Sequence, residues 1–417
     1  MSIFRNSSIY LITSVISAFA PFLIIPILTR VLTTSEYGQL ALFQTFILAL
    51  APFIGLNSIA AANRKYFDKG SNVKEINGSC FHILILSASI VSFIIFMLGD
   101  WISSLLGIDK SWIYIGVLIC IANFSISFRL SQWQISKKAI FYGILRILYT
   151  FFGAALSIYF VISLEMNASG RVDAQLWAAC FFGIISFVLL LKDDLIKMFS
   201  FKASNIREVL VFCLPLVPNS IGALIITLTD RLIINDKLGL DEVGFYMAAV
   251  QISSLFTIIL SSIYQAYTPW LFERLKMEDE IIKYQVVKST YKYFVFLLFI
   301  SIVVFLVGPK ITILFLGENY IKSGEIIGWL CLGHILNFFY MIFSSYALFA
   351  KKTGKLAIVT LSSGFINLVL LFFLIDFLGI KGAAISFVIA KVIQVVGTWF
   401  IACSSIKMPW LLFRAKS

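Results

Sequence analysis

The sequence has little charge for its length. Asp, Glu, Lys and Arg make up 13% of its 417 residues, whereas hydrophobic residues make up 60%, and the mean hydropathy is +0.98. A chain of soluble domains is excluded, because such domains need about a quarter of their residues charged to cover their surface. The hydrophobic residues form long continuous runs instead of alternating with polar ones, which excludes a transmembrane β-barrel. The composition therefore predicts an all-α polytopic membrane protein.

Residues typical of catalytic and metal sites are also scarce. The two histidines, His82 and His334, stand alone, and the six cysteines fall one per hydrophobic segment without a CxxC pair. We interpret the cysteines as small residues of apolar packing surfaces. The sequence therefore predicts neither a metal site nor a cofactor, and no catalytic residue stands out.

Cutting the sequence at its polar interruptions predicts twelve membrane-spanning helices. Each has about the 20 residues that are needed to cross the hydrocarbon layer. They cover residues 9–29, 37–57, 77–98, 111–130, 142–163, 174–191, 209–229, 244–266, 291–311, 325–349, 357–377 and 383–404. The connections 192–208 and 267–290 are longer and mix charged with large apolar residues, which is typical of helices in the membrane interface. For 267–290, a solvated charged linker is an equally good interpretation.

The net charge of +12 follows the predicted topology. With both termini on one side, 22 of the 33 Lys and Arg residues fall in the loops on that side, eight fall on the opposite side and three lie within predicted helices. Because cytoplasmic loops carry the excess of positive charge, this distribution places both termini in the cytoplasm. The positive charge therefore indicates the orientation of the protein in the membrane and adds some attraction to anionic lipids. It requires no nucleic-acid partner.

The two halves of the sequence share a short element. Glu36-Tyr37-Gly38 opens the second predicted helix, and Glu242-Val243-Gly244 opens the eighth, 206 residues later. Recurrence at the same topological place is more informative than the short match alone. We expect two pseudo-symmetric six-helix lobes, residues 1–200 and 201–417, around a central cavity and related by an axis along the membrane normal.

Five cations lie within or beside the predicted helices. They are Arg30, Arg129, Arg146, Arg231 and Lys391. A cation that faces lipid is costly, so those inside a helix should point toward other helices or water. Lys391 is too deep for its ammonium group to reach the interface easily, so a cavity-lining role is favoured. For Arg129 and Arg146, contact with the interface is an equal alternative, and for Arg30 and Arg231 anchoring at the outer interface is favoured.

Uncharged polar residues follow the same predicted helices at helical spacing. Candidate cavity-lining residues are Tyr149, Ser157, Asn219, Gln251, Ser254, Gln265, Asn337 and Gln394. Packing between helices is the alternative, and for these uncharged residues it is the more common use. No Asp or Glu falls in the middle of a predicted helix. A cavity with deep cations and no deep carboxylates suits an anionic cargo better than protons or cationic drugs.

Further motifs lie in the second half of the sequence. They are Leu316-Gly317-Glu318-Asn319-Tyr320, then Asn367, and then Leu378-Gly379-Ile380-Lys381-Gly382-Ala383-Ala384. With these motifs, the two Glu-x-Gly elements, the helix number and the length, the whole chain resembles the Wzx polysaccharide-repeat-unit (O-antigen) flippases of the multidrug/oligosaccharidyl-lipid/polysaccharide exporter superfamily. The motifs are short and identify the superfamily better than the cargo.

The resemblance implies a transporter of the bacterial plasma (inner) membrane that works by alternating access. The implied cargo is an oligosaccharide linked to undecaprenyl pyrophosphate, moved from the cytoplasmic to the outer leaflet. Polysaccharide polymerase and chain-length machinery are the further partners that the resemblance implies. Members of the family commonly carry cations in their cavity, and the five cations named above are the positions here that could correspond.

Two other functions compete with a flippase. A small-molecule or multidrug antiporter on the same scaffold would be favoured by deep carboxylates, which the predicted helices lack. A polysaccharide polymerase would need a large outer loop, and a membrane acyltransferase would need a reactive histidine with polar partners; neither feature is present. The sequence therefore favours a transporter of lipid-linked oligosaccharides over an enzyme.

Overall fold

The computed structural model describes residues 2–66, 68, 72–198, 200–215, 217, 229–277, 279–350 and 353–410. Within these ranges, side chains are described except at residues 2–8, 11, 265, 266, 269, 353 and 354. All regular secondary structure in the described ranges is helical. The expected all-α fold class is therefore confirmed.

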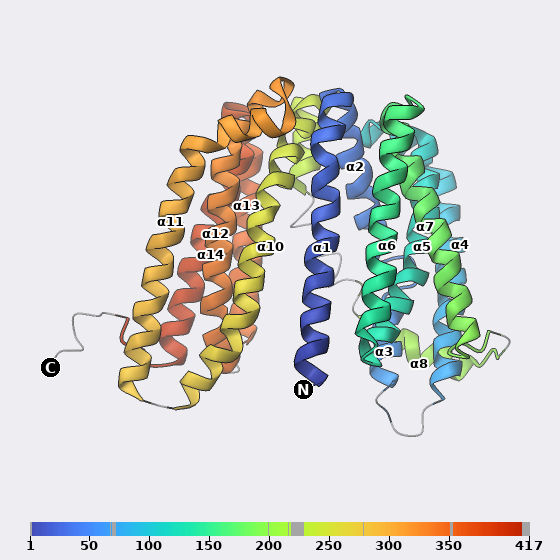
Figure 1. Cartoon of the computed structure of the whole chain (residues 1–417), viewed down its shortest axis with the longest axis horizontal. Coiled ribbons are helices and arrows are strands. Elements are labelled where there is room, and N and C mark those ends of the chain that lie inside the picture. Colours follow the sequence, from blue (N-terminus) through green and yellow to red (C-terminus); the bar gives the residue numbers. More distant parts are fainter. Residues whose placement is uncertain are drawn as a thin grey trace. The chain divides into compact units, whose positions relative to one another are not determined.

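The chain divides into two compact units, Met1–Asn235 and Asp236–Ser417. The first unit contains α1 (Ser2–Val31), α2 (Thr34–Leu50), α3 (Ser58–Lys65), α4 (Val73–Leu106), α5 (Lys110–Ile135), α6 (Ala139–Ile158), η1 (Tyr159–Ser163), α7 (Asn167–Lys192) and α8 (Ala203–Cys213). The second contains α10 (Leu240–Lys276), α11 (Glu280–Leu316), η2 (Glu318–Tyr320), α12 (Ile321–Phe349), α13 (Thr353–Leu378) and α14 (Ile380–Ser405) (Figure 1). The predicted lobes, residues 1–200 and 201–417, stay a prediction.

Ten helices among the described residues are long and apolar enough to cross a membrane. They coincide with ten of the twelve predicted spans, so the chain is a multi-pass membrane protein. The predicted span 37–57 is a shorter helix, α2, which ends at Leu50 and is followed by a turn and by α3. Of the predicted span 209–229, residues 216 and 218–228 lie outside the described ranges.

Two helices are much longer than the sequence predicted. α10 and α11 have 37 residues each, which gives each a length of about 55 Å, well beyond a hydrocarbon layer of about 30 Å. Only residues 277–279 separate them, and the Asp279 side chain caps α11 by accepting a hydrogen bond from the Ile281 N–H. The stretch 267–290 is therefore neither an interface helix nor a linker, because the helical backbone of each span continues through its charged turns.

α12 is the central helix of the second unit. It packs against α10, α11 and α14, which lie beside it (Figure 1). Its side chains Phe339, Ile342 and Tyr346 are almost fully buried and form one core with Leu271 of α10 and Val287 of α11. This core fixes the positions of the polar side chains that α12 and α14 carry.

Two of the sequence motifs have a structural reason. Glu36 forms a capping box at the start of α2, because it accepts a hydrogen bond from the Thr33 N–H at 2.9 Å while the Thr33 hydroxyl accepts one from the Glu36 N–H. Gly379 connects α13 to α14 with a φ of +58°, a region that favours glycine. At Gly382 a Cβ atom would lie 2.3 Å from the carbonyl oxygen of Leu374, so the two helices approach closely there.

Replacing Gly382 with alanine is expected to destabilise the second unit by about 1–3 kcal/mol, because the methyl group would overlap the α13 backbone. Thermal denaturation in detergent measures the loss. Gly397→Ala is the matched control on the same helix, because a Cβ atom there would meet only the Val359 side chain, at 3.0 Å. An equal or smaller loss for Gly382→Ala would contradict the close contact.

Candidate functional site

The structure brings three predicted residues together in the second unit. Lys391 lies near the middle of α14, and its ammonium group donates to Asn337 Oδ1 of α12 and to Gln394 Oε1, both at 2.9 Å. The aromatic rings of Phe387 and Tyr340 flank the ammonium group, with their centroids 5.6 and 5.9 Å from Nζ. Gln394 is nearly fully buried. Lys391 therefore points toward α12, and its cavity-lining role stays a prediction.

Two residues that the sequence analysis missed complete this group. Thr360 of α13 accepts a hydrogen bond from Gln394 Nε2 at 3.4 Å, and its hydroxyl lies 3.2 Å from the Tyr340 hydroxyl. Tyr340 follows Asn337 by three residues, so it belongs to the same face of α12 and helical spacing could have identified it. Thr360 carried no such signal, because only the packing of α13 against α14 places it there. Lys391, Asn337, Gln394, Tyr340 and Thr360 are called the lysine cluster below.

A second polar contact connects α12 to α10. The two ring nitrogens of His334 lie 2.9 Å from the Thr257 hydroxyl and 3.3 Å from the Ser253 hydroxyl. Its ring also contacts Phe387, with the centroids 5.8 Å apart. His334 is thus a hydrogen-bonded packing residue that contacts Phe387, one of the rings beside Lys391.

Lys391 has no carboxylate counter-charge within 4 Å among the described residues. The ion pairs of the second unit lie at helix ends, where Lys237 pairs with Asp376, Lys322 with Glu242 and Lys381 with Glu325. Amide oxygens and aromatic faces solvate the ammonium group only partly, because they carry no net charge. The lysine cluster is therefore a site of uncompensated positive charge inside an apolar bundle, which favours an anion.

The remaining predicted polar residues of this unit are less informative. The Ser254 hydroxyl donates to the Gln251 carbonyl oxygen of its own helix at 2.6 Å. Both residues are partly buried on α10, and their cavity-lining role stays a prediction. Asn219 and the side chain of Gln265 lie outside the described part of the chain.

In the first unit, Arg129 of α5 is buried with a partner. Only 2% of its side chain is exposed, and it forms an ion pair with Asp193, which follows α7. Its guanidinium also stacks on the Trp133 ring, 4.2 Å from the centroid. Asp193 supplies a counter-charge to Arg129 within the protein, so a cargo anion would compete with Asp193 for it.

Arg146 and Tyr149 both lie on α6 and point to different neighbours. The guanidinium of Arg146 donates to the Tyr142 hydroxyl one turn earlier. The Tyr149 hydroxyl donates to Asn123 Oδ1 of α5 at 2.8 Å. Among the described residues no carboxylate pairs with Arg146, so it remains a candidate for anion contact.

Arg171 is a cation that the sequence analysis placed in an outer loop. α7 begins at Asn167, so Arg171 lies inside this helix, and its guanidinium donates to the Ser157 hydroxyl of α6. It also lies close enough to the Tyr37 and Tyr149 phenols for electrostatic interaction. The signal was missed because the predicted helix began at residue 174. Arg171 and Ser157 therefore form a polar contact that joins α6 to α7.

The last two predicted cations differ in exposure. Arg30 is exposed at the end of α1. Arg231 is partly buried and donates to the Thr45 hydroxyl of α2 at 3.0 Å. The binding roles of Arg30 and Arg231 stay predictions.

The described helices define the class of this protein as a polytopic helical membrane protein. Residues 3–275 match the family described as polysaccharide biosynthesis protein. This match covers more than half of the chain, and the chain belongs to that family. The resemblance seen in the sequence is confirmed, and the chain is a transporter rather than an enzyme.

Two relatives support this assignment. The chain is 24% identical to a protein of the Lsg locus of Haemophilus influenzae over 361 residues, which are 84% of this chain and 86% of the relative. It is 31% identical over 166 residues to a Shigella flexneri protein described as an O-antigen transporter, 40% of this chain and 39% of that one.

Solved structures share the fold. The lipid II flippase MurJ in an inward closed conformation aligns with a TM-score of 0.75 at 13% identity, covering 95% of this chain and 87% of that one. An inward-facing multidrug resistance transporter of the MATE family, in the MOP superfamily, aligns with a TM-score of 0.62 at 17% identity over 96% of each chain. Identities this low establish the fold and leave the cargo open.

Replacing Asp193 with asparagine is expected to lower the free energy of unfolding by about 1–3 kcal/mol, because Arg129 would stay buried without its counter-charge. The loss should be smaller than for a fully buried pair, since Asp193 is 39% exposed. Thermal denaturation in detergent measures it. Asp194→Asn is the control, because Asp194 pairs with Lys74 and both side chains are at least half exposed; equal losses would contradict the buried role of the Arg129 pair.

Proposed function

We propose that this protein moves an oligosaccharide linked to undecaprenyl pyrophosphate from the cytoplasmic to the outer leaflet of the bacterial plasma membrane by alternating access. The observation that carries the proposal is the lysine cluster, in which Lys391 has two amide ligands and no carboxylate within ion-pair distance in the described ranges. The family supports a polysaccharide precursor as the cargo.

A diphosphate is the part of such a cargo that needs the protein. The polyprenyl tail can stay in the lipid, whereas a bare diphosphate in hydrocarbon would cost tens of kcal/mol by a simple solvation estimate. The ammonium group of Lys391 replaces part of the water shell of that diphosphate. The Asn337 and Gln394 side chains hold the ammonium group in position.

The alternative of a cation-coupled small-molecule antiporter has less support. Buried carboxylates are the usual binding groups for protons and cationic drugs inside a membrane. Among the described residues of the second unit, the carboxylates that form ion pairs do so at helix ends, as Asp376 and Glu242 do. The charge of the buried network therefore favours an anionic lipid.

The orientation of the protein follows from its loop charges. The excess of Lys and Arg in the loops on the side of the two termini supports cytoplasmic termini. An inside-negative potential then favours outward movement of the diphosphate. For two negative charges at about 100 mV the gain is about 4–5 kcal/mol, at about 2.3 kcal/mol per charge.

Lys391→Ala should reduce cargo transport about 10- to 100-fold, which is the effect of losing one charge-assisted hydrogen bond to phosphate. Transfer of the lipid-linked oligosaccharide between leaflets of proteoliposomes measures this, and Lys391→Arg should retain more activity because it keeps the charge. Lys237→Ala is the matched control, since Lys237 pairs with Asp376 near a helix end. If the correctly folded Lys391→Ala variant transports the cargo at the wild-type rate, the lysine cluster is not part of the cargo site.

A membrane potential should change the direction of transport. With the protein in proteoliposomes, a negative potential on the side of the termini is expected to enrich the cargo in the opposite leaflet, because the diphosphate carries the moving charge. Reversing the potential with a potassium gradient and valinomycin should reverse the enrichment. A leaflet distribution that ignores the sign of the potential would show that transport is electroneutral.

A further inference from the structure

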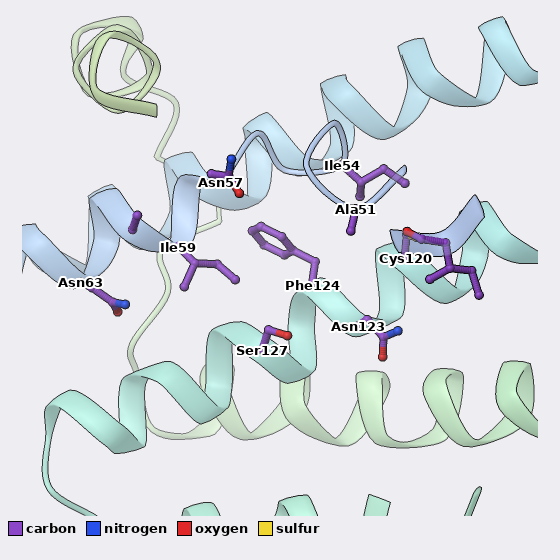
Figure 2. A pocket seen from close by; sticks show the side chains of 11 residues that line it. Ala51, Ile54, Asn57, Ile59, Asn63, Cys120, Asn123, Phe124 and Ser127 are labelled. Atoms are coloured by element: carbon purple, nitrogen blue, oxygen red, sulfur yellow. The ribbon is translucent and has the colours of Figure 1, made fainter. Parts of the chain in front are cut away.

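The first unit contains a cavity of about 510 Å³ that the lysine cluster does not use. It lies between the end of α2, the following turn, α3 and α5 (Figure 2). The lining residues are Ile47, Ala51, Ile54, Asn57, Ile59, Ala60, Asn63, Cys120, Asn123, Phe124 and Ser127. Its volume is within the range of about 300–1,000 Å³ that small-molecule sites occupy.

The cavity lies where the second membrane segment stops being helical. Gly55, Leu56 and Asn57 have positive φ angles of 76°, 47° and 57°. The Gly55 N–H is held by the Ser87 hydroxyl of α4 at 2.9 Å, and the Cys213 thiol of α8 lies 3.5 Å from the Asn57 carbonyl oxygen. Neighbouring helices thus brace the interruption. Interrupted membrane helices are tolerated where they line a cavity, and they often form substrate sites.

The interruption also determines the shape of the cavity. A Cβ atom on Gly55 would lie 2.2 Å from the Phe124 ring. Phe124 of α5 therefore packs directly against the turn, and Figure 2 shows it between Asn57 on one side and Ser127 on the other. Its ring is also in edge contact with Phe81. This packing fixes the positions of the polar lining groups around the Phe124 ring.

The carboxamides of the cavity are oriented by their neighbours. Asn123 Oδ1 accepts a hydrogen bond from the Tyr149 hydroxyl, and Asn63 Oδ1 accepts one from the Ser131 hydroxyl, both at 2.8 Å. In the described part of the chain, no acceptor contacts the NH₂ group of either amide. Both amides can therefore offer N–H donors, and the exposed Ser127 hydroxyl can donate or accept.

This set of groups distinguishes between ligand classes. No lining residue is charged, which disfavours phosphate and a carboxylate-bearing ligand. The Asn63 and Asn123 oxygens already accept hydrogen bonds, which disfavours a metal cation, because Na⁺ and Ca²⁺ bind to oxygen atoms. Neutral ligands rich in hydroxyl and amide oxygens fit the donors, and Ile47, Ile59 and Phe124 fit their C–H faces.

We propose that this cavity binds a neutral sugar residue of the cargo, an N-acetylhexosamine or hexose, separately from the cation that binds the diphosphate. The inference rests on the proposed function, since it assigns a place to the glycan of a lipid-linked oligosaccharide.

Binding of two lipids to the purified full-length protein tests the proposal. The probes are undecaprenyl pyrophosphate and the same lipid bearing one N-acetylglucosamine, with dissociation constants measured by native mass spectrometry. Wild-type protein is expected to bind the glycosylated lipid about tenfold more tightly, the effect of two or so hydrogen bonds. Asn123→Ala and Asn63→Ala should each reduce this preference about threefold without changing the affinity for the bare lipid.

A second pair of variants tests the proposal if the asparagine variants do not fold. Ser127→Phe should fill the cavity and remove the preference for the glycosylated lipid. Because Ser127 is exposed, we expect this variant to fold. Ser89→Phe is its control, an exposed position on α4 outside the lining. Equal affinities of the wild-type protein for both lipids, or a preference that survives Ser127→Phe, would overturn the sugar site alone. Binding of neither lipid would overturn the proposed function with it.

Discussion

Inside an apolar helix bundle, an ammonium group must be solvated by the protein or by its ligand. Lys391 contacts two amide oxygens and two aromatic rings, and these dipoles offset only part of the loss of water. The α12 core holds Asn337 in place, and α13 holds Gln394 through Thr360. The packing of three helices thus keeps a positive charge where the described residues offer no carboxylate within ion-pair distance.

The other cations show what the same residue type does with a different neighbour. Arg129 has Asp193 and Trp133, so it stabilises the connection between α5 and the end of α7. Among the described residues, Arg171 contacts the Ser157 hydroxyl and lies near the phenols of Tyr37 and Tyr149. A carboxylate thus compensates the charge of Arg129, whereas hydroxyls and amides solvate the charges of Arg171 and Lys391 without compensating them.

Much of the fold was predictable, because the bilayer sets the length of apolar segments. A helix satisfies every backbone hydrogen bond within such a segment. Ten spans follow from hydrophobic runs alone. For the candidate site, the sequence predicted only which polar residues share one face of a single helix. Helical spacing placed Lys391 and Gln394 on one face of α14. It could not identify Thr360, which lies on α13. Arg171 was missed because α7 begins at Asn167, a few residues before the predicted start.

The sequence by itself determined the class of protein, its span content and the sign of its buried charge, because composition and periodicity act through solvation and need no knowledge of neighbours. Only the tertiary structure decided which charges are compensated and where the second membrane segment is interrupted. The first depends on contacts such as Arg129 with Asp193, 64 residues apart. The second depends on Gly55 meeting Ser87 and Phe124, and long-range packing of this kind leaves no local pattern in the chain.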